Sequence, residues 1–306
     1  MAFNITSSAQ LLLPPKLLPP STPPSPPLTS VRSLAAPFKG ILAPFLLHTL
    51  LHKAASTLLP HVLPAATYTA LTPTDRLYLA QKLPATAHAL LVALPSLHIH
   101  LVDQPWRKDL VAPYPAQLDR LFAAHVGFTA YDLALMAVAG GEHWSAWVHH
   151  VLGGAGAVAS RYFGIGYFPA VFLPTEITVV ATNGLWVLQK IGRGGSDAYG
   201  RWLWIRAVLF VLFRAPAGAI GLWYALKVCK ENPIPSTPPA DSASPHKPSP
   251  LATLIDQFNR FPGITGYLTA ANYFAFTLLN AYWTRLVFTA LFRFGKTRGV
   301  ERSAAY

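Results

Sequence analysis

The sequence predicts an all-α protein, a polytopic bundle of six or seven transmembrane helices. Hydrophobic residues make up 52% of the 306 residues and charged residues only 12%, whereas soluble domains carry roughly 25% charged residues. The mean hydropathy is +0.35, and apolar runs recur at short intervals from about residue 38 to about residue 292. Because open strands cannot satisfy their backbone groups in lipid and barrel-type alternation is absent, these runs are expected to be helices.

The charge pattern indicates which partners to expect. The formal net charge is +12, but the Lys and Arg residues are scattered over short connections and are not gathered with stacking aromatic residues on one polar surface. This pattern favours membrane lipids with anionic headgroups as partners and argues against nucleic acid. The single cysteine, Cys229, excludes an intrachain disulfide framework and a cysteine-based metal site.

Residues 1–36 are predicted to form a disordered, proline-rich tail. Four pairs of adjacent prolines lie between residues 14 and 27, among Ser and Thr residues. Proline removes a backbone donor and favours extended polyproline conformations. The apolar run at residues 11–13 is too short for the core of a signal peptide and lacks a basic start, so no cleaved leader is expected.

The predicted membrane domain covers residues 37–292. A helix needs about 20 mostly apolar residues to cross the hydrocarbon core of roughly 30 Å. A weaker candidate at residues 41–59 contains His48, His52 and Lys53, and it either spans or lies at the interface. The six stronger candidates are residues 83–102, 118–139, 144–160, 168–189, 203–228 and 264–292. Aromatic residues typical of the membrane interface fall near the ends of these segments: Trp106, Tyr114, Trp144, Tyr167, Trp202, Trp204 and Tyr267.

The connections differ in composition from the spans. Residues 232–250 are rich in Pro and Ser and are predicted to be a mobile loop. The run at 264–292 is too long for one perpendicular span, so it is expected to begin as an interfacial turn. Residues 293–306 are predicted to be a basic C-terminal tail, and its charge mildly favours a cytoplasmic C-terminus. Lys and Arg are divided nearly equally between the two sets of alternating connections, so their count does not decide the orientation.

Polar residues inside the spans are the candidates for function, because they are costly in lipid. Asp132 follows His125 by seven residues, a spacing that returns to nearly the same face of a helix, and Asn183 follows Glu176 by the same interval. The adjacent His149 and His150 are followed by three small residues, Gly153, Gly154 and Gly156. Small residues let helices approach closely, and an interior cavity would shelter a buried carboxylate.

Each of these groups also has a purely structural interpretation. Asp132 and Glu176 suit buried ion pairs with Arg161, Arg206 or Arg214. Asn183 suits a hydrogen bond between helices, and Arg214 suits an extended conformation toward an interface or a headgroup. The remaining histidines considered, His48, His52, His98 and His100, are expected to lie near the interface.

A metal site is not expected, and neither is a cofactor. His48 and His52 have the i, i+4 spacing that holds one ion on a helix. A membrane di-iron desaturase or hydroxylase would need several more histidine boxes, whereas His143 stands six residues before His149. The adjacent His149 and His150 also point about 100° apart on a helix, which does not suit chelation of one ion.

Several of these residues, taken in order, carry a resemblance to a known family. The string Gly127-Phe128-Thr129-Ala130-Tyr131-Asp132 is followed by His149-His150, then by Pro174-Thr175-Glu176 and Asn183, then by Phe213-Arg214-Ala215-Pro216. Lys82 and His88 precede them. This order and spacing, from about residue 75 to about residue 228, resembles the TLC domain of the TRAM, Lag and CLN proteins, especially its branch of small TLC-domain-containing proteins.

The resemblance implies a lipid-related helical bundle in the endoplasmic reticulum or another endomembrane. Ceramide synthases of this family transfer an acyl group from acyl-CoA to a sphingoid-base amine, and paired histidines are central to their site. By that analogy His149 or His150 would deprotonate the amine or carry the acyl group, and Asp132 would orient the imidazole ring. Glu176 would add charge to the cavity.

One departure from the synthases weakens the analogy. The synthases have a His-Asp pair and a further Asp about one span beyond the paired histidines, whereas this chain reads Thr175-Glu176-Ile177-Thr178-Val179-Val180 there. With one carboxylate in this region, the chain resembles the non-synthase branch, some of whose members are linked to membrane composition and fluidity. The residues leave open whether the protein is an enzyme.

The sequence-based hypothesis is therefore a role in lipid homeostasis, with an acyl chain or phospholipid bound in an intramembrane cavity. The alternatives are an acyl-CoA-dependent N-acyltransferase of the ceramide-synthase type and a cargo receptor or translocation accessory of the endoplasmic reticulum. Homo-oligomerisation is left open. The catalytic candidates are His149, His150 and Asp132, and the lipid-cavity candidates are His125, Glu176, Asn183 and Arg214.

Overall fold

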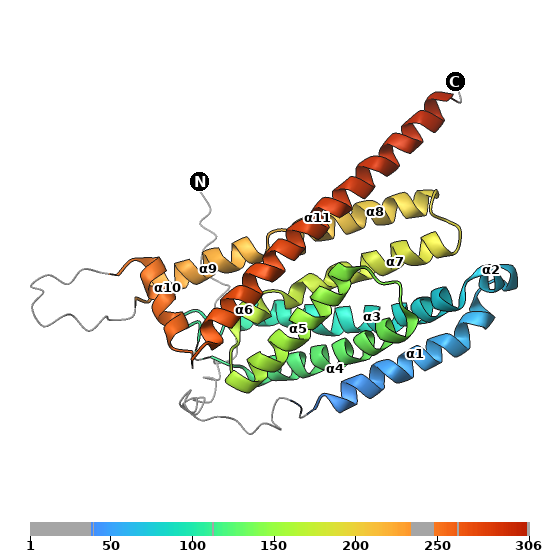
Figure 1. Ribbon diagram of the computed structural model, residues 1–306. Coiled ribbons are helices and arrows are strands. Elements are labelled where there is room, and N and C mark those ends of the chain that lie inside the picture. The colour runs from blue at the N-terminus through green and yellow to red at the C-terminus, as the bar shows by residue number, and fades with distance from the viewer. Residues whose placement is uncertain (1–37, 39, 112, 234–247, 262, 305–306) are drawn as a thin grey trace, which may run out of the picture.

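The computed structural model describes residues 38, 40–111, 113–233, 248–261 and 263–304. The described part of the chain contains helices and no strand, and the long helices run alongside one another in one bundle (Figure 1). The α-helices are α1 (Leu42–Val62), α2 (Ala65–Ala70), α3 (Pro73–His98), α4 (Ala116–Ala139), α5 (Trp144–Phe163), α6 (Tyr167–Ala170), α7 (Thr178–Lys190), α8 (Asp197–Leu209), α9 (Ala217–Glu231), α10 (Pro250–Asn259) and α11 (Thr265–Ala304). The predicted all-α polytopic bundle is confirmed.

Four helical segments of the described chain are long and apolar enough to cross a membrane: Pro73–Asp103, Ala116–Ala139, Tyr167–Lys190 and Asp197–Glu231. The chain is thus an integral membrane protein. Helices α1, α5 and α11 have 21, 20 and 40 residues and lie in the same bundle, but they are not among these four. The total of six or seven spans therefore stays a prediction.

Two spans that look continuous in the sequence are interrupted. The segment Tyr167–Lys190 changes from α6 to a 3₁₀ turn at Leu173–Ile177 before α7 begins. The segment Asp197–Glu231 contains a π-helical turn at Phe210–Arg214, between α8 and α9. Pro174 lies inside the first interruption and Pro216 follows the second, and proline cannot donate the hydrogen bond that a regular helix requires.

The ends of the bundle differ in part from the sequence-based expectations. Helix α11 is continuous from Thr265 to Ala304, so most of the predicted C-terminal tail extends this helix, which projects beyond its neighbours (Figure 1). Helices α2 and α10 were not predicted. Helix α10 begins at the end of the predicted loop, where the Ser249 side chain accepts from the Ala252 backbone amide. The predicted tail 1–36 and residues 234–247 of the loop lie outside the described residues.

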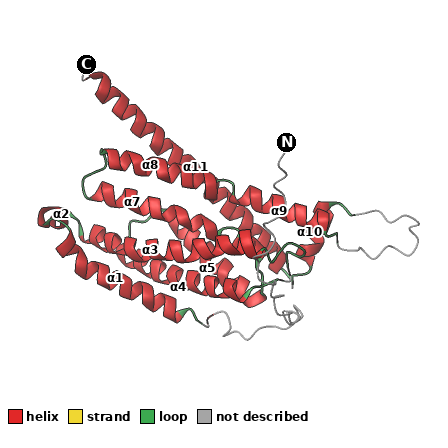
Figure 2. Cartoon of the chain, turned by 180° about the vertical axis from the view of Figure 1, so that it is seen from behind, coloured by secondary structure: helices red, strands yellow, loops and turns green. Residues whose placement is uncertain are grey.

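Connections between helices gather at the two ends of the bundle, as the view from behind shows (Figure 2). At one end, Lys190 of α7 and Asp75 of α3 form an ion pair of 2.6 Å. At the other end, Arg161 of α5 pairs with Asp119 of α4 at 3.1 Å, and Arg260 pairs with Asp109 at 2.9 Å. These ion pairs fix the ends of the helices that carry the site.

Helix α11 packs very closely against α9. A Cβ atom added at Gly218 would lie 2.2 Å from the Thr277 hydroxyl, and one added at Gly221 would lie 2.6 Å from the Tyr273 hydroxyl. The Tyr273 hydroxyl also donates a hydrogen bond to the backbone oxygen of Gly218. These glycines therefore set how near α11 comes to the rest of the bundle, because no larger residue fits there without a shift.

Candidate functional site

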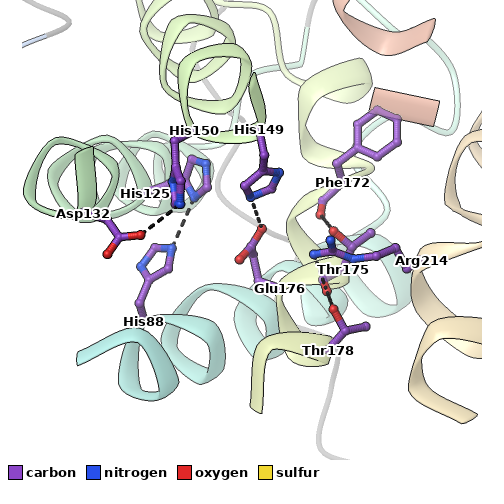
Figure 3. Close-up of polar contacts among 10 residues, drawn as sticks. All are labelled: His88, His125, Asp132, His149, His150, Phe172, Thr175, Glu176, Thr178 and Arg214. Carbon is purple, nitrogen blue, oxygen red and sulfur yellow. Dashed lines mark hydrogen bonds and ion pairs between the residues drawn. The ribbon is translucent and has the colours of Figure 1, made fainter. Parts of the chain in front are cut away.

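The adjacent histidines lie in the second turn of α5 and contact different helices (Figure 3). The Nε2 atom of His150 lies 2.9 Å from the Oδ2 atom of Asp132 on α4. The Nε2 atom of His149 lies 3.6 Å from the Oε1 atom of Glu176 in the 3₁₀ turn. Neighbouring residues on an α-helix point about 100° apart. The structure thus brings all four residues together, as two separate histidine–carboxylate pairs.

His150 and Asp132 form what we call the closed pair, because both carboxylate oxygens of Asp132 have a protein partner. The second carboxylate oxygen of Asp132 accepts a hydrogen bond of 2.8 Å from the Gln81 side-chain amide on α3. Asp132 and Gln81 are both buried. Each oxygen of this intramembrane carboxylate therefore has a protein partner, which offsets part of the cost of burying the charge.

The pair formed by His149 and Glu176 is more open. Its contact of 3.6 Å is longer than a normal hydrogen bond. The second ring nitrogen of His149, Nδ1, is buried and has no hydrogen-bond partner among the described residues. Two aromatic rings of α11 flank the imidazole, with ring centroids 5.5 Å away for Phe276 and 5.1 Å away for Trp283. His149 therefore has an unused polar atom in an aromatic environment.

A cavity of about 30 Å³ lies beside this open pair, between α4, α5, α6 and α11. Its polar lining consists of His125, His149, Glu176 and Asn272. The rest of its wall is apolar or formed by glycine: Phe122, Gly153, Gly156, Ala157, Pro169, Phe172, Leu173 and Phe276. The side-chain amide of Asn272 comes so close to α5 that a Cβ atom at Gly156 would lie 2.5 Å from its nitrogen. The cavity therefore depends on small residues of α5, as the sequence suggested.

A further histidine pair adjoins the cavity: His125 lines it and His88 contacts His125. The Nε2 atom of His88 lies 3.2 Å from the Nδ1 atom of His125, and the His88 ring stacks on Phe128 with centroids 4.0 Å apart. The Nε2 atom of His125 faces α5, since a Cβ atom at Gly153 would lie 3.1 Å from it. In each such contact one imidazole donates and the other accepts. His88 can therefore set which nitrogen of His125 carries the proton.

The four histidines expected near the interface have different environments. His48 is buried, with its ring 5.6 Å from that of His88, so the interfacial expectation was wrong for this residue. His52 contacts the Tyr131 hydroxyl at 2.6 Å, and His100 contacts the Ala170 backbone oxygen at 3.0 Å. His98 is exposed and lies 3.4 Å from the Asp103 carboxylate. Packing of α1 against α3 and α4, which its composition did not reveal, buries His48.

Two predicted lipid-cavity residues lie outside the cavity wall. The Asn183 side-chain amide donates a hydrogen bond of 3.0 Å to the Thr86 hydroxyl, joining α7 to α3. Arg214 is buried at the end of the π-helical turn and donates to the Thr175 backbone oxygen at 3.4 Å. Asn183 thus has the interhelical role weighed for it, and Arg214 lies next to the turn that carries Glu176.

Sequence reasoning missed Gln81, Asn272, Phe276 and Trp283, which contact or line the site. Gln81 precedes His88 by seven residues, a spacing that places both on one helix face and could have found it. Nothing in the sequence marked Phe276 or Trp283, which lies seven residues after it. Asn272 lies in an apolar run that also contains Asn280 and several Thr residues, so composition did not distinguish it. Among the described residues, no group of three His, Cys, Asp or Glu side chains is arranged to hold a metal ion.

Comparison with known families identifies the domain. The family model for the TLC domain, the homology domain of TRAM, Lag and CLN proteins, matches residues 78–289. This range begins in α3, ends in α11 and contains both histidine–carboxylate pairs. Searches of curated proteins and of solved structures found no match.

Proposed function

The chain belongs to the TLC-domain family of membrane proteins, whose roles lie in lipid metabolism and homeostasis, and we propose that it binds an acyl chain or a phospholipid in the cavity beside His149. By this binding it influences the lipid composition of its membrane. The same family relation supports a location in the endoplasmic reticulum or another endomembrane. Fractionation of cells that express the tagged protein would test the location.

One observation carries this proposal. The Nδ1 atom of His149, buried and without a partner among the described residues, belongs to the ring that lines the mostly apolar cavity with Glu176. A buried polar atom without a partner is costly. A ligand with an alkyl chain and a polar group would satisfy both the apolar wall and this nitrogen, as typical ligand sites do.

Ligand entry requires movement of the wall. The cavity of about 30 Å³ has room for only a few water molecules, whereas ligand pockets commonly enclose about 300–1,000 Å³. Asn272 and Phe276 of α11 form one side of the wall. Helix α11 also packs closely against α9 at Gly218 and Gly221. Ligand entry would therefore require α11 to separate from α5 along this wall.

Photo-crosslinking tests the binding. A fatty acid with a photoactivatable group on its alkyl chain should label wild-type protein on peptides of α4, α5 or α11. The Phe276→Trp variant, which places a larger ring at the wall, should be labelled less. Absence of labelling in folded wild-type protein, or labelling only of lipid-facing helix surfaces, would contradict the proposal.

Cellular lipid profiles test the consequence. Cells lacking the protein should show an altered membrane-lipid profile that the wild-type chain restores. The double variant His149→Ala/His150→Ala should not restore it. Full rescue by the double variant would remove the histidine pairs from the proposed function.

The contact between His149 and Glu176 also favours a second candidate, an acyl-CoA-dependent N-acyltransferase. The carboxylate would orient the imidazole, which would accept the proton of an attacking amine while the amine forms an amide bond and the CoA thiolate leaves. Purified protein supplied with labelled acyl-CoA and a sphingoid base should then release CoA and form the amide. A folded preparation that binds acyl lipids but gives no turnover would exclude this candidate.

A further inference from the structure

Arg214 is a buried cation that has no ion pair within the described part of the chain. Only 4% of the residue is exposed. Its guanidinium group donates one long hydrogen bond, 3.4 Å to the Thr175 backbone oxygen, and lies over the rings of Phe210 at 5.3 Å and Trp283 at 4.8 Å. Its Nε atom is buried without a hydrogen-bond partner. A charge inside a membrane bundle normally has a counter-ion or lies on a ligand path.

The local backbone keeps Arg214 inside the bundle. The π-helical turn is closed by a hydrogen bond of 2.7 Å from the Ala215 amide to the Phe210 oxygen. Phe210 and Arg214 are buried, whereas Val211 and Leu212 between them are exposed. The guanidinium group therefore does not extend toward an interface, which was one interpretation of the sequence. Single π-helical turns often occur at functional sites.

The nearby carboxylates are occupied by other partners. Glu176 contacts His149 and Asp132 contacts His150. Figure 3 shows the guanidinium group of Arg214 turned toward Thr175, on the side of the site where Glu176 lies. No described Asp or Glu thus lies within ion-pair distance of Arg214. Glu176 attracts its charge from farther away, and the guanidinium group has no direct anionic partner among the described residues.

Trp283 connects Arg214 to the cavity. Its ring centroid lies 5.1 Å from that of His149, and Arg214 lies over the same ring. Trp283 and the cavity-lining Phe276 are seven residues apart on α11, so they share one face of that helix. A chain lying along Phe276 would therefore extend toward Trp283 and Arg214.

We propose that Arg214 binds the anionic oxygen headgroup of a single-chain lipid whose alkyl chain occupies the cavity beside His149. This inference rests on the proposed function and specifies that the bound lipid carries a negative charge. The planar guanidinium group suits two oxygens of one anion, as in a carboxylate or a phosphate. A free fatty acid and a lysophospholipid both supply such oxygens.

Headgroup preference tests the inference. Displacement of the photo-crosslinkable fatty acid from the purified full-length chain is measured with oleate, 1-oleoyl-lysophosphatidic acid and the neutral oleyl alcohol. Wild type should bind at least one of the two anionic lipids about tenfold more tightly than the alcohol, as expected for charge-assisted hydrogen bonds. The tighter of the two anions identifies carboxylate or phosphate as the headgroup.

Two variants separate binding from folding. Arg214→Met should lose the preference for the anion while its affinity for oleyl alcohol stays within about twofold of wild type. Arg206→Met is the matched control, because Arg206 lies on the preceding helix and also has a buried Nε atom without a partner, and it should keep the preference. If Arg214→Met does not fold, Arg214→Lys keeps a charge without the planar group and should show a reduced preference.

The possible results are distinguishable. Equal affinity of wild type for the anions and the alcohol would overturn the inference while leaving lipid binding in place. An unchanged preference in a folded Arg214 variant would also overturn it. Failure of wild type to bind any of these lipids would instead contradict the proposed function.

Discussion

His149 and His150 are neighbours in the chain, but their surroundings differ. His150 forms a contact of 2.9 Å with a carboxylate whose other oxygen is bonded to Gln81. His149 forms a contact of 3.6 Å, lines the cavity and has a buried nitrogen without a partner among the described residues. One turn of helix thus provides a closed pair whose carboxylate oxygens are both bonded and an open pair that borders the cavity.

Removing the closed pair should have the largest effect on stability. His150→Ala leaves the buried Asp132 carboxylate without its histidine, and breaking a buried ion pair typically costs about 3–5 kcal/mol. We expect the free energy of unfolding to fall by about 3 kcal/mol, whereas His149→Ala should lower it by about 1 kcal/mol. Denaturation of both variants in the same detergent measures the difference. Equal losses would show that the two pairs have the same role.

Cross-linking α5 to α11 should have the largest effect on lipid binding. In a Cys229→Ser background, Gly156→Cys and Asn272→Cys would place two thiols on facing positions of α5 and α11. The oxidised protein should lose photo-crosslinking to the fatty acid by at least about tenfold, as expected if ligand entry needs separation of these helices, and reductant should restore it. Unchanged labelling of the oxidised protein would show that the ligand enters elsewhere.

Replacing the open histidine should weaken binding more than it weakens the fold. His149→Ala removes the unpartnered Nδ1 atom together with the imidazole ring that lines the cavity, and we expect affinity for the acyl ligand to fall about tenfold. His98→Ala, which changes an exposed histidine of α3, is the control and should bind like wild type. If His149→Ala binds normally but unfolds easily, the open pair is structural.

The smallest effect is expected at Asn183. Its hydrogen bond to Thr86 joins α7 to α3 away from the cavity wall, and such interhelical bonds in membranes contribute about 0.6 kcal/mol. Asn183→Ala should lower the free energy of unfolding by about this amount and leave lipid labelling unchanged. A large loss of labelling would instead place Asn183 in the ligand site.

The sequence predicts the bundle well because apolar runs of about 20 residues have few alternatives to helices in lipid. The interruptions at Pro174 and Pro216 were not predicted. The spans were identified from the mean composition of about 20 residues, and this mean hardly changes when one residue lacks a backbone N–H donor. Helix α10 has only 10 residues and was missed for the same reason. The part of α11 after residue 292 was missed because it lies beyond the apolar run.

The site was predictable as a set of residues and not as a set of contacts. The seven-residue spacings placed the carboxylates and His125 on helix faces, and the adjacent histidines marked α5. Which histidine meets which carboxylate depends on how the helices pack, and the spacing of residues along each single helix does not give that packing. The partners supplied by α1 and α11, His48 and Trp283, depend on contacts between residues far apart in the chain.

The position of α11 in the chain gives the site an order of assembly during synthesis. Helices α3 to α9 emerge before α11 and already carry both histidine–carboxylate pairs. Asn272, Phe276 and Trp283, which cover His149 and its cavity, emerge only with α11. Until α11 inserts against Gly218 and Gly221, His149 and Glu176 lack this covering wall. Quality-control factors of the membrane would therefore encounter an uncovered polar site in any nascent chain in which α11 has not yet inserted.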